Sequence, residues 1–115
     1  MPRMPTTFDV FNAIAEPRRR EIIDLLADGQ AKAVTDLVDA TALSQSAVSK
    51  HLGVLRAVGI VSVRRLGRNR LYSLQPKELR PVHDWAKQFE RFWSHQLDRI
   101  KQRAERKAAA RGGNY

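Results

Sequence analysis

Apolar residues recur three and four positions apart in the first part of the chain, a spacing typical of helices packed on a core. It predicts a first helix over residues 7–16 and a second that starts at Pro17 and ends at Gly29. Proline suits the first turn of a helix, and glycine is common just past its end. A short third helix, capped by Thr35 and Asp36, and then a fourth helix are expected to follow.

The periodicity changes near the middle of the chain. β-Branched and aromatic residues alternate with polar ones over residues 60–65 and 70–74, which predicts a two-stranded β-hairpin. We expect residues 66–69 to form a four-residue turn, in which Gly67 and Asn69 are suited to positive φ.

Helical spacing returns at Val82 and continues beyond Ile100. Residues 1–6 are expected to form a flexible N-terminus, and residues 104–115, rich in Ala, Lys and Arg, a basic and disordered tail. A single domain over residues 7–103 remains. The predicted fold is mainly α with a two-stranded β-hairpin, in the order α-α-α-α-β-β-α.

Composition narrows the class of protein. A chain of 115 residues with 43% hydrophobic and 29% charged residues builds one modest globular core. Cysteine is absent, which excludes disulfides, thiolate metal sites and cysteine nucleophiles. No stretch reaches the roughly 20 apolar residues of a membrane span, and Asp9 and Asn12 interrupt any signal-peptide core. We therefore expect a soluble, cytoplasmic protein without a membrane partner.

Charge is unevenly distributed along the chain. The net charge is +9, made up of −2 over residues 1–43 and +11 over residues 44–115. Residues 44–77 contain no acidic residue at all. Such a segment favours a polyanionic partner, and nucleic acid is the main class. The alternative is a solvated basic face that keeps the protein soluble.

The fourth predicted helix carries the clearest functional pattern. With Ser44 as its N-cap, the apolar residues Val48, Leu52 and Leu55 fall on one core-facing stripe. The opposite face holds short polar and basic side chains, which suit base edges in the DNA major groove. Together with the preceding short helix, this helix predicts a helix-turn-helix. The alternative is the ordinary exposed face of an amphipathic helix. The candidate DNA-contacting residues of this region are Thr35, Ser44, Gln45, Ser46, Ser49, Lys50 and His51.

The predicted hairpin also carries side chains that can bind DNA. Arginine at a hairpin tip can enter the minor groove or bind the flanking phosphates. In the alternative interpretation, one or two of the arginines pair with acids of the last helix, namely Asp84, Glu90 or Asp98. The candidate DNA-contacting residues of the hairpin are Arg64, Arg65, Arg68, Asn69 and Arg70.

The last helix carries an apolar stripe that a domain of this size cannot bury alone. A two-fold homodimer would cover it with its own copy, so we expect dimerisation through the first and last helices. In the alternative, Trp85 and Phe89 complete the core of the monomer. The expected interface residues are Phe8, Phe11, Trp85, Phe89, Phe92, Trp93, Leu97 and Ile100.

Catalytic patterns are missing from the sequence. It contains no G-x-G-x-x-G, no defensible Ser-His-acid order and no identifiable carboxylate pair. We therefore expect neither an enzyme nor a cofactor.

The segment from Phe11 to Leu74 resembles the winged helix-turn-helix of ArsR-type bacterial transcriptional regulators. A minor departure is Glu16, because most members of the family have aspartate before the proline. The resemblance implies a homodimer with one recognition helix per protomer in adjacent major grooves, and usually repression of the protein's own operon. It is carried by residues 15–20, 22–26, 43–52, 55–59 and 67–72.

Many members of the family sense metals. One of the family's two familiar site types needs cysteines and is excluded here. The other lies on the last helix, where the matching residues are Asp84, His95 and Asp98; Val82 stands at a ligand position, and His83 is one residue out of register. We expect no metal site. The alternative is a weak nickel or zinc site on those three residues.

The expected function is that of a sequence-specific DNA-binding transcriptional regulator, a repressor of its own operon, which binds an inverted-repeat operator as a homodimer. Two alternatives belong to other classes. One is a basic nucleic-acid-binding protein without sequence preference, and the other is a helical module whose aromatic last helix binds a partner protein. No residue pattern identifies an inducing ligand.

Overall fold

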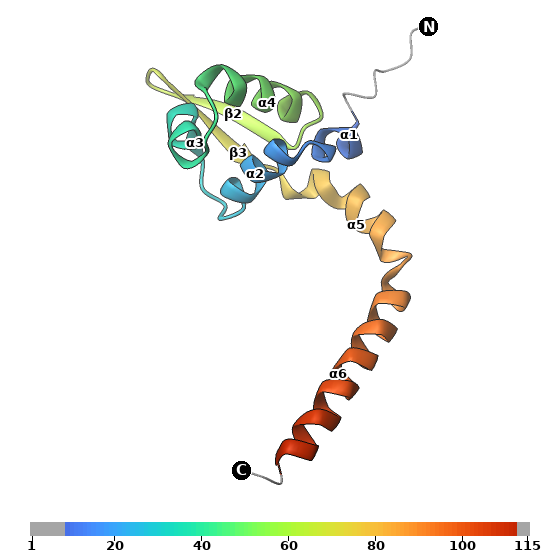
Figure 1. Cartoon of the computed structure of the whole chain (residues 1–115). Helices are drawn as coiled ribbons and strands as arrows, with labels where there is room; N and C mark the ends of the chain where they lie inside the picture. Colours follow the sequence, from blue (N-terminus) through green and yellow to red (C-terminus); the bar gives the residue numbers. More distant parts are fainter. Residues whose placement is uncertain (1–8, 113–115) are drawn as a thin grey trace, which may run out of the picture. The chain divides into compact units, whose positions relative to one another are not determined.

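The computed structural model describes the backbone of residues 9–112 and the side chains of that range except residues 95, 97, 98 and 109–112. It divides into two compact units between Val82 and His83. The predicted fold, mainly α with a β-hairpin, is confirmed (Figure 1). The elements are α1 (Val10–Ala15), α2 (Pro17–Leu26), β1 (Lys32–Ala33), α3 (Val34–Ala40), α4 (Gln45–Ala57), β2 (Val61–Leu66), β3 (Asn69–Leu74), the 3-10 turn η2 (Pro76–Leu79), α5 (Arg80–Lys87) and α6 (Glu90–Gly112).

Side-chain caps set the ends of the first two helices. Asp9 accepts a hydrogen bond from the Phe11 N–H at 2.6 Å, so α1 is shorter than the predicted range of residues 7–16. Glu16 ends α1 and accepts from the Arg18 N–H at 3.2 Å, which makes it the N-cap of α2. Pro17 occupies the first turn of α2, as predicted.

Two arginines of α2 bind the C-terminal end of α1. The last carbonyl groups of a helix have no partner within that helix, and cations are favourable there. The Arg19 guanidinium donates to the carbonyl oxygens of Ala13 and Asn12, and Arg20 donates to that of Ile14 at 2.7 Å. The arginines thereby fasten α1 to α2.

The start of α3 differs from the prediction. The helix begins at Val34 with Ala33 as its N-cap, so Thr35 and Asp36 lie inside its first turn. Asp36 still helps to close this end, because its carboxylate accepts from the Ala33 N–H at 3.1 Å. The shift arises because Ala33 belongs to a strand that immediately precedes the helix.

That strand, β1, extends the predicted two-stranded hairpin to a three-stranded antiparallel sheet in the order β1-β3-β2. Lys32 lies opposite Tyr72, and Ala33 lies opposite Leu71. Two residues are too few to show the alternation of apolar and polar side chains that predicts a strand, so β1 is identified only by its pairing with β3. The addition makes β3 the central strand and leaves β2 at an edge.

The hairpin turn spans residues 66–69, as predicted. Leu66 and Asn69 pair across the strands, which leaves Gly67 and Arg68 as a two-residue loop. Gly67 has a φ of +63°, and no described residue other than glycine has a positive φ. Positive φ at the first loop residue alone is the pattern of a type II′ turn. The predicted four-residue turn over residues 66–69 with Gly67 at positive φ is confirmed, whereas Asn69 does not have the positive φ expected of it.

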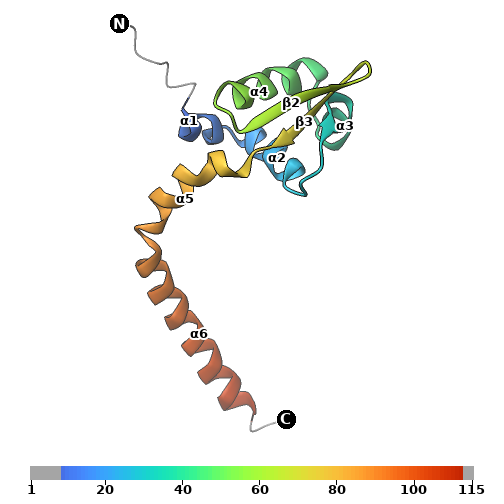
Figure 2. The same ribbon diagram turned by 180° about the vertical axis from the view of Figure 1, so that it is seen from behind.

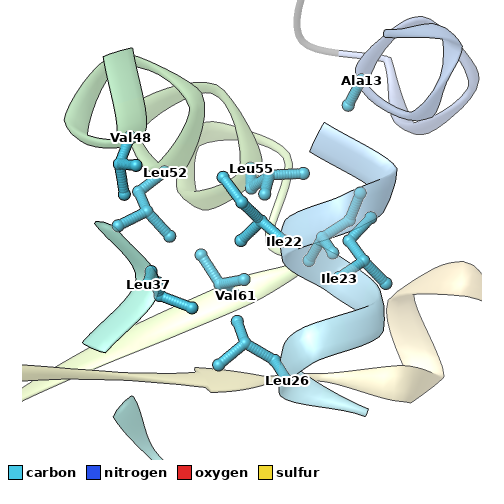
Figure 3. Close-up of a cluster of buried hydrophobic side chains, with 10 residues drawn as sticks. Ala13, Ile22, Ile23, Leu26, Leu37, Val48, Leu52, Leu55 and Val61 are labelled. Carbon is cyan, nitrogen blue, oxygen red and sulfur yellow. The ribbon is translucent and has the colours of Figure 1, made fainter. Parts of the chain in front are cut away.

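The core of the N-terminal unit is built on α4. Val48, Leu52 and Leu55 are fully buried, as their spacing predicts. Figure 3 shows them pointing toward Ile22 of α2 and Leu37 of α3. Every buried residue among those described is apolar. The buried set consists of Ala13, Ile22, Ile23, Leu26, Leu37, Val48, Leu52, Leu55, Ile60 and Val61.

The predicted last helix is interrupted. It forms α5 and α6, which are separated at Gln88 and Phe89. The Gln88 side-chain amide donates to the Trp85 carbonyl oxygen at 2.9 Å, at the C-terminal end of α5. Apolar spacing alone cannot reveal this break, because the stripe continues through it.

The C-terminal end of α6 also differs from the prediction. The helix extends to Gly112, so residues 104–112 of the segment expected to be disordered are helical. Alanine, lysine and arginine are strong helix formers, which accounts for the extension. The composition that resembles a loose tail is therefore also that of a helix.

We expect Leu52→Ala to lower the free energy of unfolding by about 2–5 kcal/mol, because it removes a fully buried side chain from the centre of the core. Denaturant unfolding followed by circular dichroism measures the change. Gly53→Ala is the neighbouring control, since nothing lies within 4 Å of an added Cβ there; it should stabilise α4 by about 0.5–1 kcal/mol. Equal effects of the two changes would contradict the described packing.

Candidate nucleic-acid interface

Two hydroxyl groups fix the turn that orients α4. Thr41 donates to the Leu37 carbonyl oxygen at 2.8 Å and accepts from the Leu43 N–H at 3.3 Å, which ties the end of α3 to the turn. Ser44 accepts from the Ala47 N–H at 3.1 Å and is the N-cap of α4, as predicted. The hydroxyl of Ser44 is therefore already engaged in capping.

The face of α4 opposite its buried stripe is exposed and free of acids. Gln45, Ser46, Ser49 and Lys50 are all exposed, and His51 is half-buried at the edge of this face. Gly53 continues the same face without a side chain. Thr35 is exposed in the first turn of α3. The helix thus presents amide, hydroxyl and ammonium groups on a short, smooth surface.

The hairpin arginines predicted to contact DNA are exposed to solvent. Figures 1 and 2 show its tip extending beyond α3 and α4 in both views. Arg64, Arg65, Arg68 and Arg70 are exposed, and within the part of the chain that the structure describes none of them forms an ion pair or a side-chain hydrogen bond. The alternative pairing with acids of the last helix stays a prediction. Asn69, also exposed, is the first residue of β3.

Sequence reasoning missed Arg56. This residue of the last turn of α4 lines a hollow of about 250 Å³ together with Val63, Arg64, Arg65 and Arg70. It lies inside the acid-free segment, so charge alone could have included it. Its association with the hairpin arginines depends on the packing of α4 against β2, which sequence spacing does not supply.

The C-terminal unit exposes the predicted aromatic residues. Trp85, Phe92, Trp93 and Ile100 are 56%, 54%, 51% and 61% exposed. Trp85 packs edge-to-face on Phe89, with 5.4 Å between the ring centroids.

The other expected interface residues are distributed as follows. In the N-terminal unit Phe11 is 40% exposed. Phe8 and the side chain of Leu97 lie outside the described residues.

No group of three or more His, Asp or Glu side chains that could hold a metal occurs among the described residues. Of the three residues of the alternative nickel or zinc site, Asp84 is exposed, whereas the side chains of His95 and Asp98 lie outside the described part. None of the helices described is long and apolar enough to cross a bilayer.

Comparison with known proteins agrees with this geometry. Residues 16–63 match the family model described as bacterial regulatory protein, arsR family. The transcriptional repressor SdpR of Bacillus subtilis is 35% identical over 81 residues, which span 70% of this chain and 89% of SdpR. A transcriptional repressor SmtB homolog from Synechocystis is 44% identical over 66 residues, which span 57% of this chain and 49% of that protein.

A solved structure, the ArsR-like transcriptional regulator from Rhodococcus sp. RHA1, superposes with a TM-score of 0.62 at 29% identity. The match covers 85% of this chain and 92% of that one. The chain belongs to the ArsR family of bacterial transcriptional regulators and has a winged helix-turn-helix fold.

Proposed function

We propose that this regulator is a homodimeric repressor that binds an inverted-repeat operator, with α4 of each protomer in a major groove. The observation that carries the proposal is the exposed, acid-free polar face of α4, held in place by three fully buried residues on the other side of the helix. A major groove admits a helix of this kind, and amide and hydroxyl groups can read its base edges.

The side chains divide into two roles. Gln45 and Ser49 are one turn apart on α4 and exposed, so we assign them to base edges, with glutamine suited to adenine. Ser46 and Lys50 form the adjacent row, and lysine there can meet guanine or phosphate. We assign Ser44 and His51 of the α4 region, and Thr35 in the first turn of α3, to positioning on the DNA backbone.

Repression and dimerisation rest on separate supports. Two relatives are named transcriptional repressors, and repression is the mode usual for the family. The aromatic surface of α5 and α6 is the surface assigned to the dimer, because a two-fold axis lets one apolar patch cover its copy. Two recognition helices related by that axis require half-sites about one helical turn apart.

A sequence-tolerant nucleic-acid-binding protein is the second candidate, favoured by the charge of +11 over residues 44–115. Selection of bound DNA from a random pool separates the two candidates. A repressor should select one inverted repeat, whereas a sequence-tolerant protein should select no motif.

We expect Gln45→Ala to relax base preference at one position of each half-site, since one good bidentate contact is worth about 1–3 kcal/mol of discrimination. Selection from random DNA, followed by binding titrations of single-base operator variants, measures the change. Gln30→Ala is the matched control, because Gln30 is exposed in the α2–β1 connection, outside α4. An unchanged motif in Gln45→Ala would contradict the assignment of α4 to the major groove.

The charge pattern predicts a strong salt dependence. Residues 44–74 hold six cations and no acid, so a dimer presents twelve, of which we expect about half to reach phosphate. With about 6–8 contacts, log K against log salt should have a slope of about −5 to −7. Arg68→Ala should reduce the magnitude of the slope by about 2, one contact for each protomer. A wild-type slope near zero would exclude backbone contact by this surface.

Removing the aromatic surface should prevent assembly. We expect Phe89→Ala combined with Trp93→Ala to give monomers or insoluble protein and to abolish tight operator binding, because a two-fold operator needs both recognition helices. Sedimentation at micromolar concentration measures the mass of the particle. Gln96→Ala, an exposed polar position of the same helix, should remain dimeric. A stable wild-type monomer would refute the dimer.

A further inference from the structure

Four arginines from three elements line one hollow of the N-terminal unit. Arg56 comes from the last turn of α4, Arg64 and Arg65 from β2, and Arg70 from β3; Val63 is the one apolar residue of the lining. The volume of about 250 Å³ accommodates one phosphate group with several waters, since a water occupies about 30 Å³ in the liquid.

The register of the hairpin places two of these charges face to face. Arg65 lies directly opposite Arg70 in the antiparallel pair. Val63 and Tyr72, the neighbouring pair on the same face, are half-buried. Like charges directly opposite one another destabilise a sheet. The pair therefore costs stability in the free protein unless an anion lies between the two guanidinium groups.

No such anion is supplied by the described residues of the N-terminal unit. None of its carboxylates pairs with Arg56, Arg65 or Arg70, and residues 44–77 contain no acid. Cations on an edge strand such as β2 also discourage pairing with other chains. That role is met by any positive side chain, however, and does not require arginines of α4 and β3 around the same hollow.

We propose that this hollow is a binding site for one phosphate group, held by the guanidinium groups of Arg56, Arg65 and Arg70. Guanidinium forks bind phosphate oxygens with paired, charge-assisted hydrogen bonds, and a tetrahedral group can accept them from several directions. The group can be a backbone phosphodiester of operator DNA or a free phosphate. The DNA source rests on the proposed function, whereas the site itself does not.

The first arm of the test uses inorganic phosphate and the full chain without DNA. Phosphate should raise the thermal midpoint of the wild type and shift the guanidinium NMR signals of Arg56, Arg65 and Arg70, whereas chloride at equal ionic strength should not. Arg56→Gln and Arg65→Gln should weaken phosphate binding about tenfold or more. Lys77→Gln, which removes one exposed charge outside the hollow, should leave it unchanged.

Arg65→Lys distinguishes a phosphate site that needs guanidinium groups from a positive charge that only keeps the edge strand β2 from pairing with other chains. It keeps the positive charge on β2 but loses the planar fork, so it should also weaken phosphate binding. Arg65→Gln in the absence of phosphate should be at least as stable as the wild type, because the opposed charges are relieved. This second readout keeps loss of binding distinct from loss of folding.

The second arm uses operator duplexes in which single phosphates are replaced by neutral methylphosphonates. If DNA is the source, one phosphate in each half-site should lose its contribution in Arg56→Gln and Arg65→Gln, so that the penalties of variant and replacement do not add. Inorganic phosphate could instead bind the hollow while the affinity losses of variant and replacement add at every operator position. The natural ligand of the hollow would then be a free phosphate, and the proposed site would stand.

The site and the function fail in different ways. Absence of phosphate binding in the first arm, with Arg56→Gln and Arg65→Gln matching Lys77→Gln in both arms, would overturn the site even if Gln45 still determines the selected motif. Phosphate binding at the hollow in a protein that selects no DNA motif would instead overturn the proposed function and leave the site standing.

Discussion

The packing of one apolar stripe determines what the rest of the molecule can present. Val48, Leu52 and Leu55 bury one side of α4 against α2, α3 and the sheet, and the core has no polar member among the described residues. Because side chains of a helix diverge around its axis, burying this stripe turns Ser46, Lys50 and Gly53 outward on the opposite side. The core thus fixes the rotation of the helix, and the chemistry of the exposed face follows from that rotation.

Elements with long, regular periodicity were predictable from sequence. The buried stripe of α4, the Ser44 cap and the alternation in the hairpin each repeat over enough residues to identify the element. The features that were missed depend on contacts between distant residues or on a single side chain. β1 exists through its pairing with β3, and α5 ends where one glutamine amide binds a backbone carbonyl.

The candidate site divides in the same way. Composition places the cations in one segment, and helical spacing selects the residues on the outer face of α4. Neither composition nor helical spacing shows which arginines of the hairpin lie next to one another. The register distinguishes Arg65 and Arg70, which oppose each other, from Arg68 in the loop, and only tertiary packing brings Arg56 beside them. The charge pattern therefore predicts which segment is basic, whereas the strand register and the tertiary packing show which arginines lie together.

The two arginines that hold the end of α1 have a consequence for the order of folding. A helix of six residues is far below the roughly 12–15 residues that an isolated helix needs for marginal stability in water. Since Arg19 and Arg20 satisfy carbonyls of α1 from within α2, α1 gains its stability after α2 has formed. Its amide protons should then exchange with solvent in the same cooperative unit as those of α2. Phe11 is therefore oriented on a helical surface only in chains whose N-terminal unit has already folded.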